Sequence, residues 1–474
     1  MDAGKIAPGG GVSRPDVGAR PVEASTPQDS VALGSTDSEA VRRAALAKLL
    51  KHGTPPTAAH VFWQSDINDM RKNSRGGGFL PARPVVTPDG HCYVGTNRGE
   101  LIAFDPEGKP EWRKTLGEVS PYNDPTLGWD GALVLTNEHD TRLLCLEPDG
   151  SVRYDTNLPE MARSRPEVDP QGRVFVIGDS GLHATHPDGT HAWSVPNPAQ
   201  YCGFFLRPDG SAMVYGVDAD AGSKCKLQCV SPEGKVLWGY THEGRPGGMP
   251  ATGPDGETII SDTSRVKIFD AGGHQLRSLD LGSDLDEPLV DPDGHIFVAS
   301  QDGQIRSLDM NLQENWRVDQ PGAASCPLAL GPDGTLYATS VMGRVHAFDG
   351  KDGSRRWTCD VSEQLPAQAF TRVLPAPDGT VFVRGEKKVH VLDRDGLRRG
   401  NMGGEDYLTA SREPLLNGRL AVTDLDRVYL IGPADWLENL PDPPKVTHPT
   451  GDVKRVGDWV IINGVRVPVR KQKA

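Results

Sequence analysis

The sequence of 474 residues has no long apolar run and no apolar leader at its N-terminus. A helix needs about 20 consecutive apolar residues to span a bilayer, and no stretch approaches that length. The opening MDAGKIAPGGGVSRPDVG lacks the apolar segment of a secretory signal, and no lipobox-like cysteine lies near the start. These absences predict no membrane span and a location that is either cytoplasmic or reached by export without a classical signal peptide.

Cysteine is scarce and poorly placed for a disulfide framework or a zinc site. The seven cysteines are scattered, odd in number, and form neither a CxxC motif nor an adjacent pair. Disulfide scaffolds use an even, regularly spaced set, and zinc cages need four convergent ligands. The sequence therefore predicts reduced, structural cysteines and no metal site.

Positive charge is also deficient, because 51 Lys and Arg residues face 64 Asp and Glu residues, giving a net charge of −13. Nucleic-acid binders concentrate basic residues to displace counterions from phosphates. The composition therefore excludes a general nucleic-acid binder. Ser-His-Asp, P-loop and GxGxxG arrangements are not found either, so the sequence nominates no catalytic nucleophile.

Glycine and proline are abundant instead, at 55 and 40 residues, whereas hydrophobic residues make up only 36% of the chain. This balance favours many short strands joined by turns, so we expect an all-β fold. Residues 1–36 show no apolar period and are expected to be disordered. Residues 37–53 are predicted to form one helix that is capped by Asp37 or Ser38 and ends at Gly53.

A unit of about 40 residues recurs from residue 81 onward. Each unit alternates apolar and polar residues with period 2, which buries one face of each strand against the next unit. The marker of each unit is a two-residue turn, found at Asp89-Gly90, Asp130-Gly131, Gln171-Gly172, Asp209-Gly210, Asp255-Gly256, Asp293-Gly294, Asp333-Gly334, Asp378-Gly379 and Asn417-Gly418. The spacing predicts a single β-propeller of four-stranded blades, with nine repeats counted and eight blades as the alternative.

A tryptophan motif accompanies the turns. The segment from Ala347 to Trp357, AFDGKDGSRRW, matches the pattern A-x-D-x-x-x-G-x-x-x-W, and the second, fifth and eighth units carry Tyr154, Leu276 and Leu397 near the place of the tryptophan. Through this motif the sequence resembles the PQQ-like (quinoprotein-type) β-propeller repeat family over about residues 60–431. In that family the tryptophan locks one blade onto its neighbour. The resemblance thus implies blade-docking roles for Trp63, Trp112, Trp193, Trp238, Trp316 and Trp357.

The two ends of the propeller, predicted at 60–433, are expected to share one blade. The last unit supplies three strands and no outer strand, while residues 60–66, HVFWQSD, form a short apolar stretch before the first inner strand. An outer strand donated from the N-terminus would remove the exposed edges at both ends of the ring. Residues 434–474 are predicted to form a linker and a hairpin around Asn463-Gly464. This hairpin either packs on the propeller or augments the sheet of a partner.

The resemblance leaves an enzyme as an alternative. Quinoprotein dehydrogenases commonly carry an adjacent cysteine pair over the cofactor, which this sequence lacks, and only Trp129 among the spare tryptophans lies near an inner strand. The repeated Pro-Asp-Gly serves as a turn, and His183, His186 and His191 are expected to be structural or solvated. We therefore predict no cofactor, with a PQQ-dependent dehydrogenase and a metal-dependent lactonase or lyase as the alternatives.

Several inner strands begin with a residue followed by proline, which is tolerated in a strand that faces a solvent channel. The charged residues at this place, Arg83, Asp124, Arg165 and Glu287, are candidate ligand contacts at the channel mouth. Their mixed charges suit a peptide or small ligand better than a focused catalytic set of carboxylates. The predicted function is a monomeric, non-enzymatic scaffold for protein or peptide partners. The resemblance points to bacterial PQQ-like proteins without the quinone, including an outer-membrane assembly lipoprotein, from which this chain departs at its N-terminus.

Overall fold

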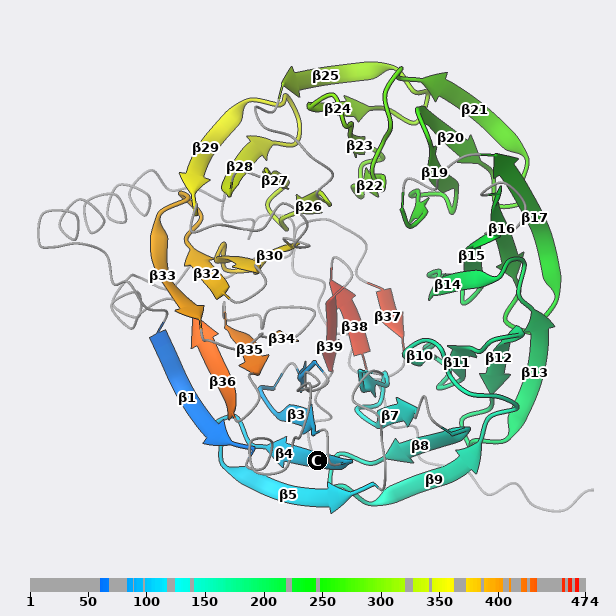
Figure 1. The fold of residues 1–474 in the computed structure, drawn as a ribbon, viewed down its shortest axis with the longest axis vertical. Coiled ribbons are helices and arrows are strands. Elements are labelled where there is room, and N and C mark those ends of the chain that lie inside the picture. The colour runs from blue at the N-terminus through cyan, green and yellow to red at the C-terminus, as the bar shows by residue number, and fades with distance from the viewer. Residues whose placement is uncertain are drawn as a thin grey trace, which may run out of the picture.

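The computed structural model arranges the strands in a closed ring around a central channel, with a small separate sheet (Figure 1). The structure describes residues 60–67, 83–87, 89–96, 99–116, 124–136, 140–218, 224–243, 248–319, 327–340, 343–361, 372–384, 388–403, 409–410, 419–423, 427–432, 454–456, 459–462 and 465–468. The segment predicted to be disordered, 1–36, and the predicted helix 37–53 lie outside these residues. No helix in the described part of the chain is long and apolar enough to cross a membrane.

The ring consists of four-stranded antiparallel sheets, nine of them among the described residues. In eight of these sheets the strands run in chain order from the channel outward. Blades 1 to 3 comprise β2 (Val85–Val86), β3 (Cys92–Gly95), β4 (Glu100–Phe104) and β5 (Pro110–Thr115); β6 (Thr126–Leu127), β7 (Leu133–Thr136), β8 (Arg142–Leu146) and β9 (Val152–Asn157); β10 (Glu167–Val168), β11 (Val174–Ile177), β12 (Gly181–Thr185) and β13 (His191–Pro196). Blades 4 to 6 comprise β14 (Tyr201–Leu206), β15 (Ala212–Asp218), β16 (Lys224–Val230) and β17 (Val236–Glu243); β18 (Ala251–Thr252), β19 (Thr258–Asp262), β20 (Arg265–Phe269) and β21 (Gln275–Asp280); β22 (Leu289–Val290), β23 (Ile296–Ala299), β24 (Gln304–Leu308) and β25 (Glu314–Asp319).

Blades 7 and 8 comprise β26 (Ala329–Leu330), β27 (Thr335–Thr339), β28 (Arg344–Asp349) and β29 (Arg355–Asp360); β30 (Arg372–Pro375), β31 (Val381–Arg384), β32 (Lys388–Leu392) and β33 (Arg398–Gly403). Blade 9 comprises β34 (Thr409–Ala410), β35 (Leu420–Thr423), β36 (Arg427–Gly432) and, as its outer strand, β1 (His60–Asp66). The all-β propeller is confirmed, and the blade count is nine rather than eight.

The ring closes through the pairing of β1 with β36. The two strands run antiparallel, with Asp66 opposite Arg427 and His60 opposite Gly432, and a bulge lies between Val61 and Trp63. The expected donation of an N-terminal outer strand is confirmed. Closure leaves no unpaired edge between the first and last blades, since both ends of the propeller belong to one sheet.

The turns that mark each repeat connect the first and second strands of the blades. Their glycines have φ between 75° at Gly334 and 98° at Gly90 in the eight turns that the structure describes; Gly418 lies outside it. A side chain at such a φ costs about 1–2 kcal/mol. Gly90 closes its turn by donating its N–H to Thr87 O over 2.9 Å. The glycine is therefore required by the turn conformation.

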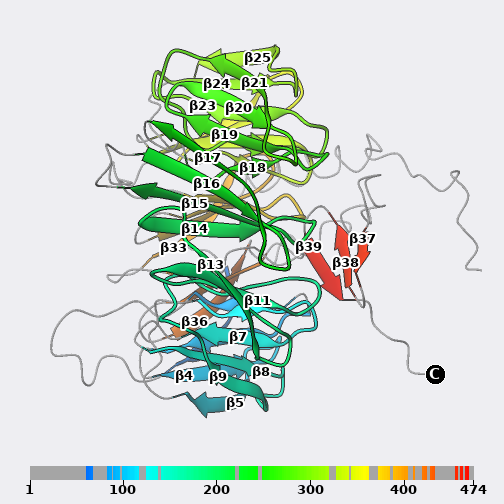
Figure 2. The ribbon, with the colours of Figure 1, turned by 90° about the vertical axis from the view of Figure 1, so that its right-hand side faces the viewer.

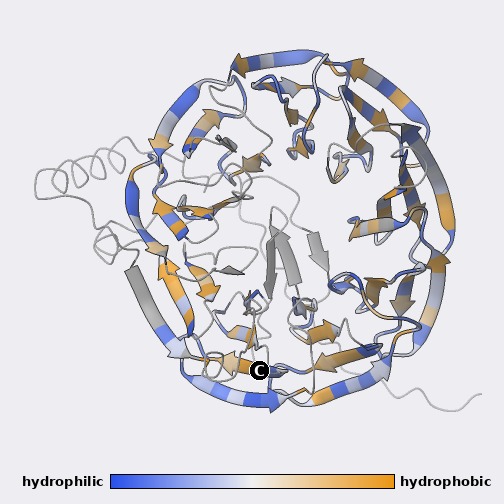
Figure 3. Cartoon of the chain, viewed as in Figure 1, coloured by the Kyte–Doolittle hydropathy of each residue, from blue (hydrophilic) through white to orange (hydrophobic). Residues whose placement is uncertain are grey.

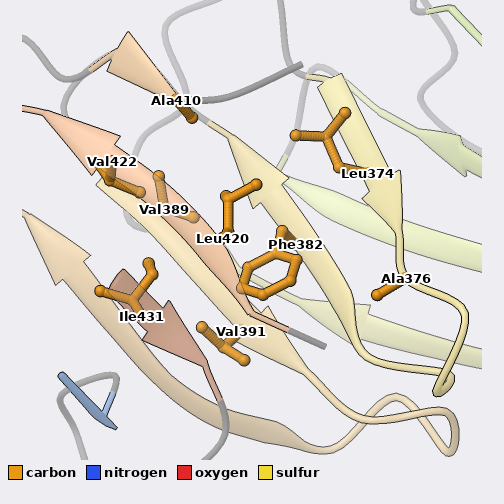
Figure 4. Packing of buried hydrophobic residues seen from close by; sticks show 9 residues of the cluster. All are labelled: Leu374, Ala376, Phe382, Val389, Val391, Ala410, Leu420, Val422 and Ile431. Carbon is orange, nitrogen blue, oxygen red and sulfur yellow. The ribbon is translucent and has the colours of Figure 1, made fainter. Parts of the chain in front are cut away.

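The apolar core lies between neighbouring blades. Between blades 8 and 9, Phe382 and Val391 meet Leu420 and Ile431, all fully buried (Figure 4). The middle strands are buried on both faces, as in β7, whereas the outer strands alternate between exposed and half-buried residues, as in β9. Figure 3 shows this difference as apolar colour on the middle strands and mixed colour around the rim. Because each core needs two blades, we expect no blade to fold alone.

A three-stranded sheet follows the propeller, formed by β37 (Lys454–Val456), β38 (Trp459–Ile462) and β39 (Val465–Pro468). Ile462 pairs with Val465 on either side of the predicted Asn463-Gly464 turn. The strand β37 was not predicted. Figures 1 and 2 place this sheet over the central channel, on one face of the disc.

Candidate functional site

The four predicted channel-mouth residues each precede the proline that opens an innermost strand. Two of them, Arg83 and Asp124, lie together although they come from blades 1 and 2. The Arg83 backbone N–H donates to Asp124 Oδ1 over 3.0 Å, and the guanidinium Nε lies 3.7 Å from Asp124 Oδ2. These contacts tie two neighbouring blades together at the mouth and neutralise both charges locally.

The other two mouth residues lie in different surroundings. Arg165 pairs with Glu167 in the same blade. Glu287 packs against the backbone of Gly248, where an added Cβ would come within 2.5 Å of the Glu287 Cβ. Burial, together with the charge of Glu287, raises the pKa of the adjacent Asp286 to about 6. The residues predicted at the mouth therefore form local ion pairs in blades 1 to 3, and two acidic residues, Asp286 and Glu287, adjoin in blade 6.

The indoles of five predicted docking tryptophans reach the neighbouring blade. Each donates its Nε1–H to a backbone oxygen in the turn between the third and fourth strands of the next blade. The pairs and distances are Trp112 with Pro148, 3.0 Å; Trp193 with Pro232, 3.1 Å; Trp238 with Ala271, 3.0 Å; Trp316 with Gly350, 3.0 Å; and Trp357 with Arg394, 2.8 Å. Each ring also covers a glycine of that turn, as Trp112 covers Gly150.

The sixth predicted docking residue, Trp63, lies on β1, and its side chain is outside the described residues. The same strand contacts blade 1 through Ser65, whose hydroxyl donates to Gly108 O. In blade 2, Tyr154 takes the tryptophan position and covers Gly189 of blade 3. These contacts are the geometry that docking requires, and the docking role of each tryptophan remains a prediction.

Strand register shows which residues replace the tryptophan in blades 5 and 8. Arg277 pairs with Ile268, and Gly400 pairs with Val391, at the position where Trp316 pairs with Ser307. The equivalents are therefore Arg277 and Gly400, which are one residue from Leu276 and three residues from Leu397, the residues that the sequence placed near this position.

In blades 5 and 8, which lack the tryptophan, the described part of the following blade also lacks the glycine turn that the tryptophan would cover. Blade 6 has Leu312 at the place of the turn glycine, with φ of 61°, and its buried side chain fills the blade 5 to 6 interface. Blade 9 has no such turn, because its outer strand comes from the other end of the propeller. An aromatic ring, from a tryptophan or from Tyr154, thus occupies this position where the described part of the next blade has a turn with a glycine.

A hydrogen-bonded chain of three side chains lies on blade 3. His183 Nε2 is 2.6 Å from Glu160 Oε1, and His183 Nδ1 is 2.8 Å from Ser194 Oγ. Glu160 also accepts the backbone N–H groups of Ser180, at 3.0 and 3.1 Å, and Gly181, at 3.0 Å. Burial raises the pKa of the Glu160 carboxyl, but the hydrogen bonds from His183 and Ser180 outweigh it and leave the pKa lowered.

From the sequence, His183 was expected to be structural or solvated, and its two partners were not identified. Glu160 lies in the loop between β9 and β10, and Ser194 lies on β13, so no short motif connects them. One signal was available in the turn Gly178-Asp179-Ser180-Gly181. A Cβ on Gly178 would lie 2.3 Å from Glu160 Oε1, so the glycine makes room for the carboxylate.

One group of possible metal ligands occurs among the described residues, formed by Asp291, Asp293 and His295 in a turn of blade 6. Their donor atoms lie within 4.8 Å of one another. The imidazole Nδ1 of His295 is 2.8 Å from Asp291 Oδ2, and its backbone N–H donates to Asp291 Oδ1 over 2.8 Å. The group is thus half-exposed, and His295 is hydrogen bonded to Asp291. This is the arrangement expected of an Asp-Gly turn that is followed by a histidine.

Trp129, the spare tryptophan near an inner strand, lies between blades 2 and 3. Its Nε1–H donates to Val168 O over 3.0 Å, and the side chain packs against the buried cluster that contains Val134 and Val174. The six cysteines of the described residues are free thiols. The residues around Trp129 thus form a packed blade interface.

The sequence matches the family described as outer membrane protein assembly factor BamB over residues 123–252 and 262–402, which is more than half of the chain. It is 29% identical over 138 residues to the outer membrane protein assembly factor BamB of Nitrosomonas eutropha, a match that spans 28% of this chain and only 30% of that relative. The crystal structure of BamB from Moraxella catarrhalis covers 79% of this chain and 100% of its own, with 14% identity and a TM-score of 0.44.

The C-terminal WD40 domain of Sif2 covers 81% of this chain and 100% of its own, with 10% identity and a TM-score of 0.51. At that identity the likeness concerns the propeller fold alone. The family match coincides with the repeats described above, from blade 2 through blade 8. The chain therefore belongs to the BamB-type family of PQQ-like β-propellers.

Proposed function

We propose that the protein is a scaffold that binds a protein or peptide partner at the channel mouth and carries out no chemistry at that mouth. The observation that carries the proposal is the charge arrangement of the mouth. Arg83 and Asp124 neutralise each other across two blades, and Arg165 is paired with Glu167. Polar groups that are already paired locally suit recognition of an extended surface, whereas a catalytic pair of carboxylates needs separated pKa values at one reacting centre.

The family supports the same proposal. Its description names a factor for the assembly of outer membrane proteins, which implies protein partners for the relatives that carry the name. By extension we propose that this chain works outside the cytoplasm, in the cell envelope. The cytoplasmic alternative drawn from the sequence has no support among the relatives.

The mouth also offers an apolar contact for a partner. Met249, which precedes the proline of blade 5 as Glu287 does in blade 6, leaves 41% of its surface exposed. Exposed methionines adapt to varied peptide surfaces because the side chain is flexible and polarisable. A partner segment that contacts Met249 would lie close to the acidic residues Asp286 and Glu287.

Site-specific photocrosslinking in cells tests the proposal. A photoreactive amino acid is placed at Met249 in the mouth and, as the matched control, at Val152 on an outer strand, where 48% of the surface is exposed. The proposal predicts one discrete crosslinked protein for Met249 that Val152 does not give, and its loss in the Glu287→Lys variant. Identical patterns at both positions, or no discrete product at Met249, would contradict the proposal.

A further inference from the structure

Glu160, His183 and Ser194 form an acid, base and nucleophile arrangement on the outer side of blade 3. The distances are 2.6 Å from Glu160 Oε1 to His183 Nε2 and 2.8 Å from His183 Nδ1 to Ser194 Oγ. A hydroxyl in contact with an imidazole whose other nitrogen contacts a carboxylate is the arrangement that activates serine for covalent chemistry. This chain of contacts joins the β9–β10 loop to β12 and β13.

The carboxylate determines which nitrogen of His183 accepts the serine proton. An ionised carboxylate only accepts hydrogen bonds, so the hydrogen of the contact with Glu160 is on Nε2. In the neutral imidazole the lone pair is then on Nδ1, the nitrogen that faces Ser194. Burial alone would raise the pKa of Glu160. The hydrogen bonds from His183 and from the backbone lower this pKa by more than burial raises it, so the carboxyl stays ionised. Gly178 leaves room for this carboxylate.

Ser194 is accessible, whereas His183 is buried. The imidazole is 4% exposed, and Ser194 is exposed on β13, the outermost strand of its sheet. A second imidazole is near, with His191 Nε2 at 3.2 Å from Ser194 Oγ. A small molecule can therefore reach the hydroxyl from solvent, while the base below it is held in one orientation.

Blade 7 supplies an internal comparison. His346 and Thr358 form the same cross-strand pair, at 3.0 Å between Nδ1 and Oγ1. Here the Nε2 atom is buried without a hydrogen-bond partner in the described part of the chain. Burial, with Arg355 and Arg344, lowers the pKa of His346 to about 4. The histidine and hydroxyl pair therefore recurs, and the carboxylate is the addition found in blade 3.

We propose that Ser194 is a nucleophile that accepts acyl groups from small carboxylic esters. Ser194 Oγ attacks the carbonyl carbon while its proton passes to His183 Nδ1, and the C–O bond to the alcohol breaks as that proton moves to the leaving oxygen. Water then attacks the acyl-serine by the same route, which releases the carboxylic acid and regenerates the hydroxyl. Glu160 is the positioning residue, since it acts through His183.

Covalent labelling of the full chain tests the proposal. The protein is incubated with a fluorescent fluorophosphonate, whose phosphorus forms a bond to the serine oxygen as fluoride leaves, and the adduct is located by peptide mass mapping. Hydrolysis of p-nitrophenyl acetate is followed in parallel. We expect labelling at Ser194 that is absent in Ser194→Ala, and a rate that falls about 100-fold in Glu160→Gln.

Two controls separate chemistry from folding. Glu160→Gln keeps a hydrogen-bond acceptor for the backbone, so its thermal midpoint should match that of the parent while its labelling rate falls. Thr358→Ser places a serine hydroxyl beside His346 without a carboxylate, and position 358 should remain unlabelled in that variant. No adduct at Ser194, labelling at position 358 of Thr358→Ser as fast as at Ser194, or an unchanged rate in Glu160→Gln would each overturn the proposal.

Discussion

The indole of Trp316 spans the interface between blades 6 and 7 and donates its Nε1–H to Gly350 O, 3.0 Å away. The ring is 9% exposed, lies 5.9 Å from the ring of Phe297, and covers Gly353. Because the buried Trp316 N–H donates to an oxygen of the next blade, this hydrogen bond fixes the position of one sheet relative to the other. The contact combines apolar burial with one directional bond.

Trp316→Ala should therefore destabilise the propeller strongly. Removal of a buried tryptophan costs about 3–5 kcal/mol of unfolding free energy, and Trp316→Phe should lose only about 1 kcal/mol through the missing hydrogen bond. Urea unfolding followed by circular dichroism measures both. Leu276→Ala, at a side chain that is 48% exposed, is the control and should stay within about 0.5 kcal/mol of the parent. A Trp316→Ala loss no larger than this control would refute the docking role.

The blade 5 to 6 interface should accept the tryptophan and glycine pair that it lacks. Leu312→Gly relieves a left-handed φ worth about 1–2 kcal/mol but removes a buried side chain worth about 2–5 kcal/mol, so alone it should destabilise. Arg277→Trp alone meets the Leu312 side chain and should also destabilise. In the double variant the indole covers the new glycine, and a double-mutant cycle should give a favourable coupling of about 1–3 kcal/mol. Additive effects of the two changes would show that no docking contact forms.

Asp286 should make the protein less stable as pH rises from 3.8 to about 6. Its folded pKa is raised from 3.8 to about 6 by burial and by Glu287. Between these two values the folded chain binds the extra proton, so the free energy of unfolding falls with rising pH. Asp286→Asn should therefore unfold at higher urea than the parent at pH 7.5, with a smaller difference at pH 5. An equal difference at both pH values would contradict the raised pKa.

Addition of PQQ and Ca²⁺ should leave the mass of the native protein unchanged. Trp129, the spare tryptophan near an inner strand, donates to Val168 O between two blades and packs against a buried cluster there. Native mass spectrometry before and after incubation measures stoichiometric binding. A mass gain of one quinone would favour the dehydrogenase alternative over the scaffold.

The fold was largely predictable because its determinants repeat along the chain. The blades share a glycine at the first turn, most of them carry an aromatic residue that covers the next blade, and both features recur at nearly constant spacing. The nine-blade count followed once HVFWQSD was assigned to the last blade, since β1 pairs with β36. The sequence pointed to Leu276 instead of Arg277 because the exposed outer strand of blade 5 lacks the apolar alternation that sets its register.

The candidate sites were less predictable, because their contacts join residues that no repeat relates. Arg83 and Asp124 occupy equivalent positions in successive blades, so their proximity follows from the repeat itself. Glu160 reaches His183 from a loop that differs in sequence from the corresponding loops of the other blades. A pattern search for a nucleophile with its base nearby in sequence does not detect such a set.

The shared ninth blade has a consequence during synthesis. β1 is the first strand of the ring to leave the ribosome, and its partner β36 is among the last. At roughly 5–20 residues per second, β1 stays without its partner strand β36 for on the order of tens of seconds. Throughout that time the nascent chain exposes both an unpaired strand and an uncovered apolar blade face, so its demand for chaperones should peak just before the last blade is made.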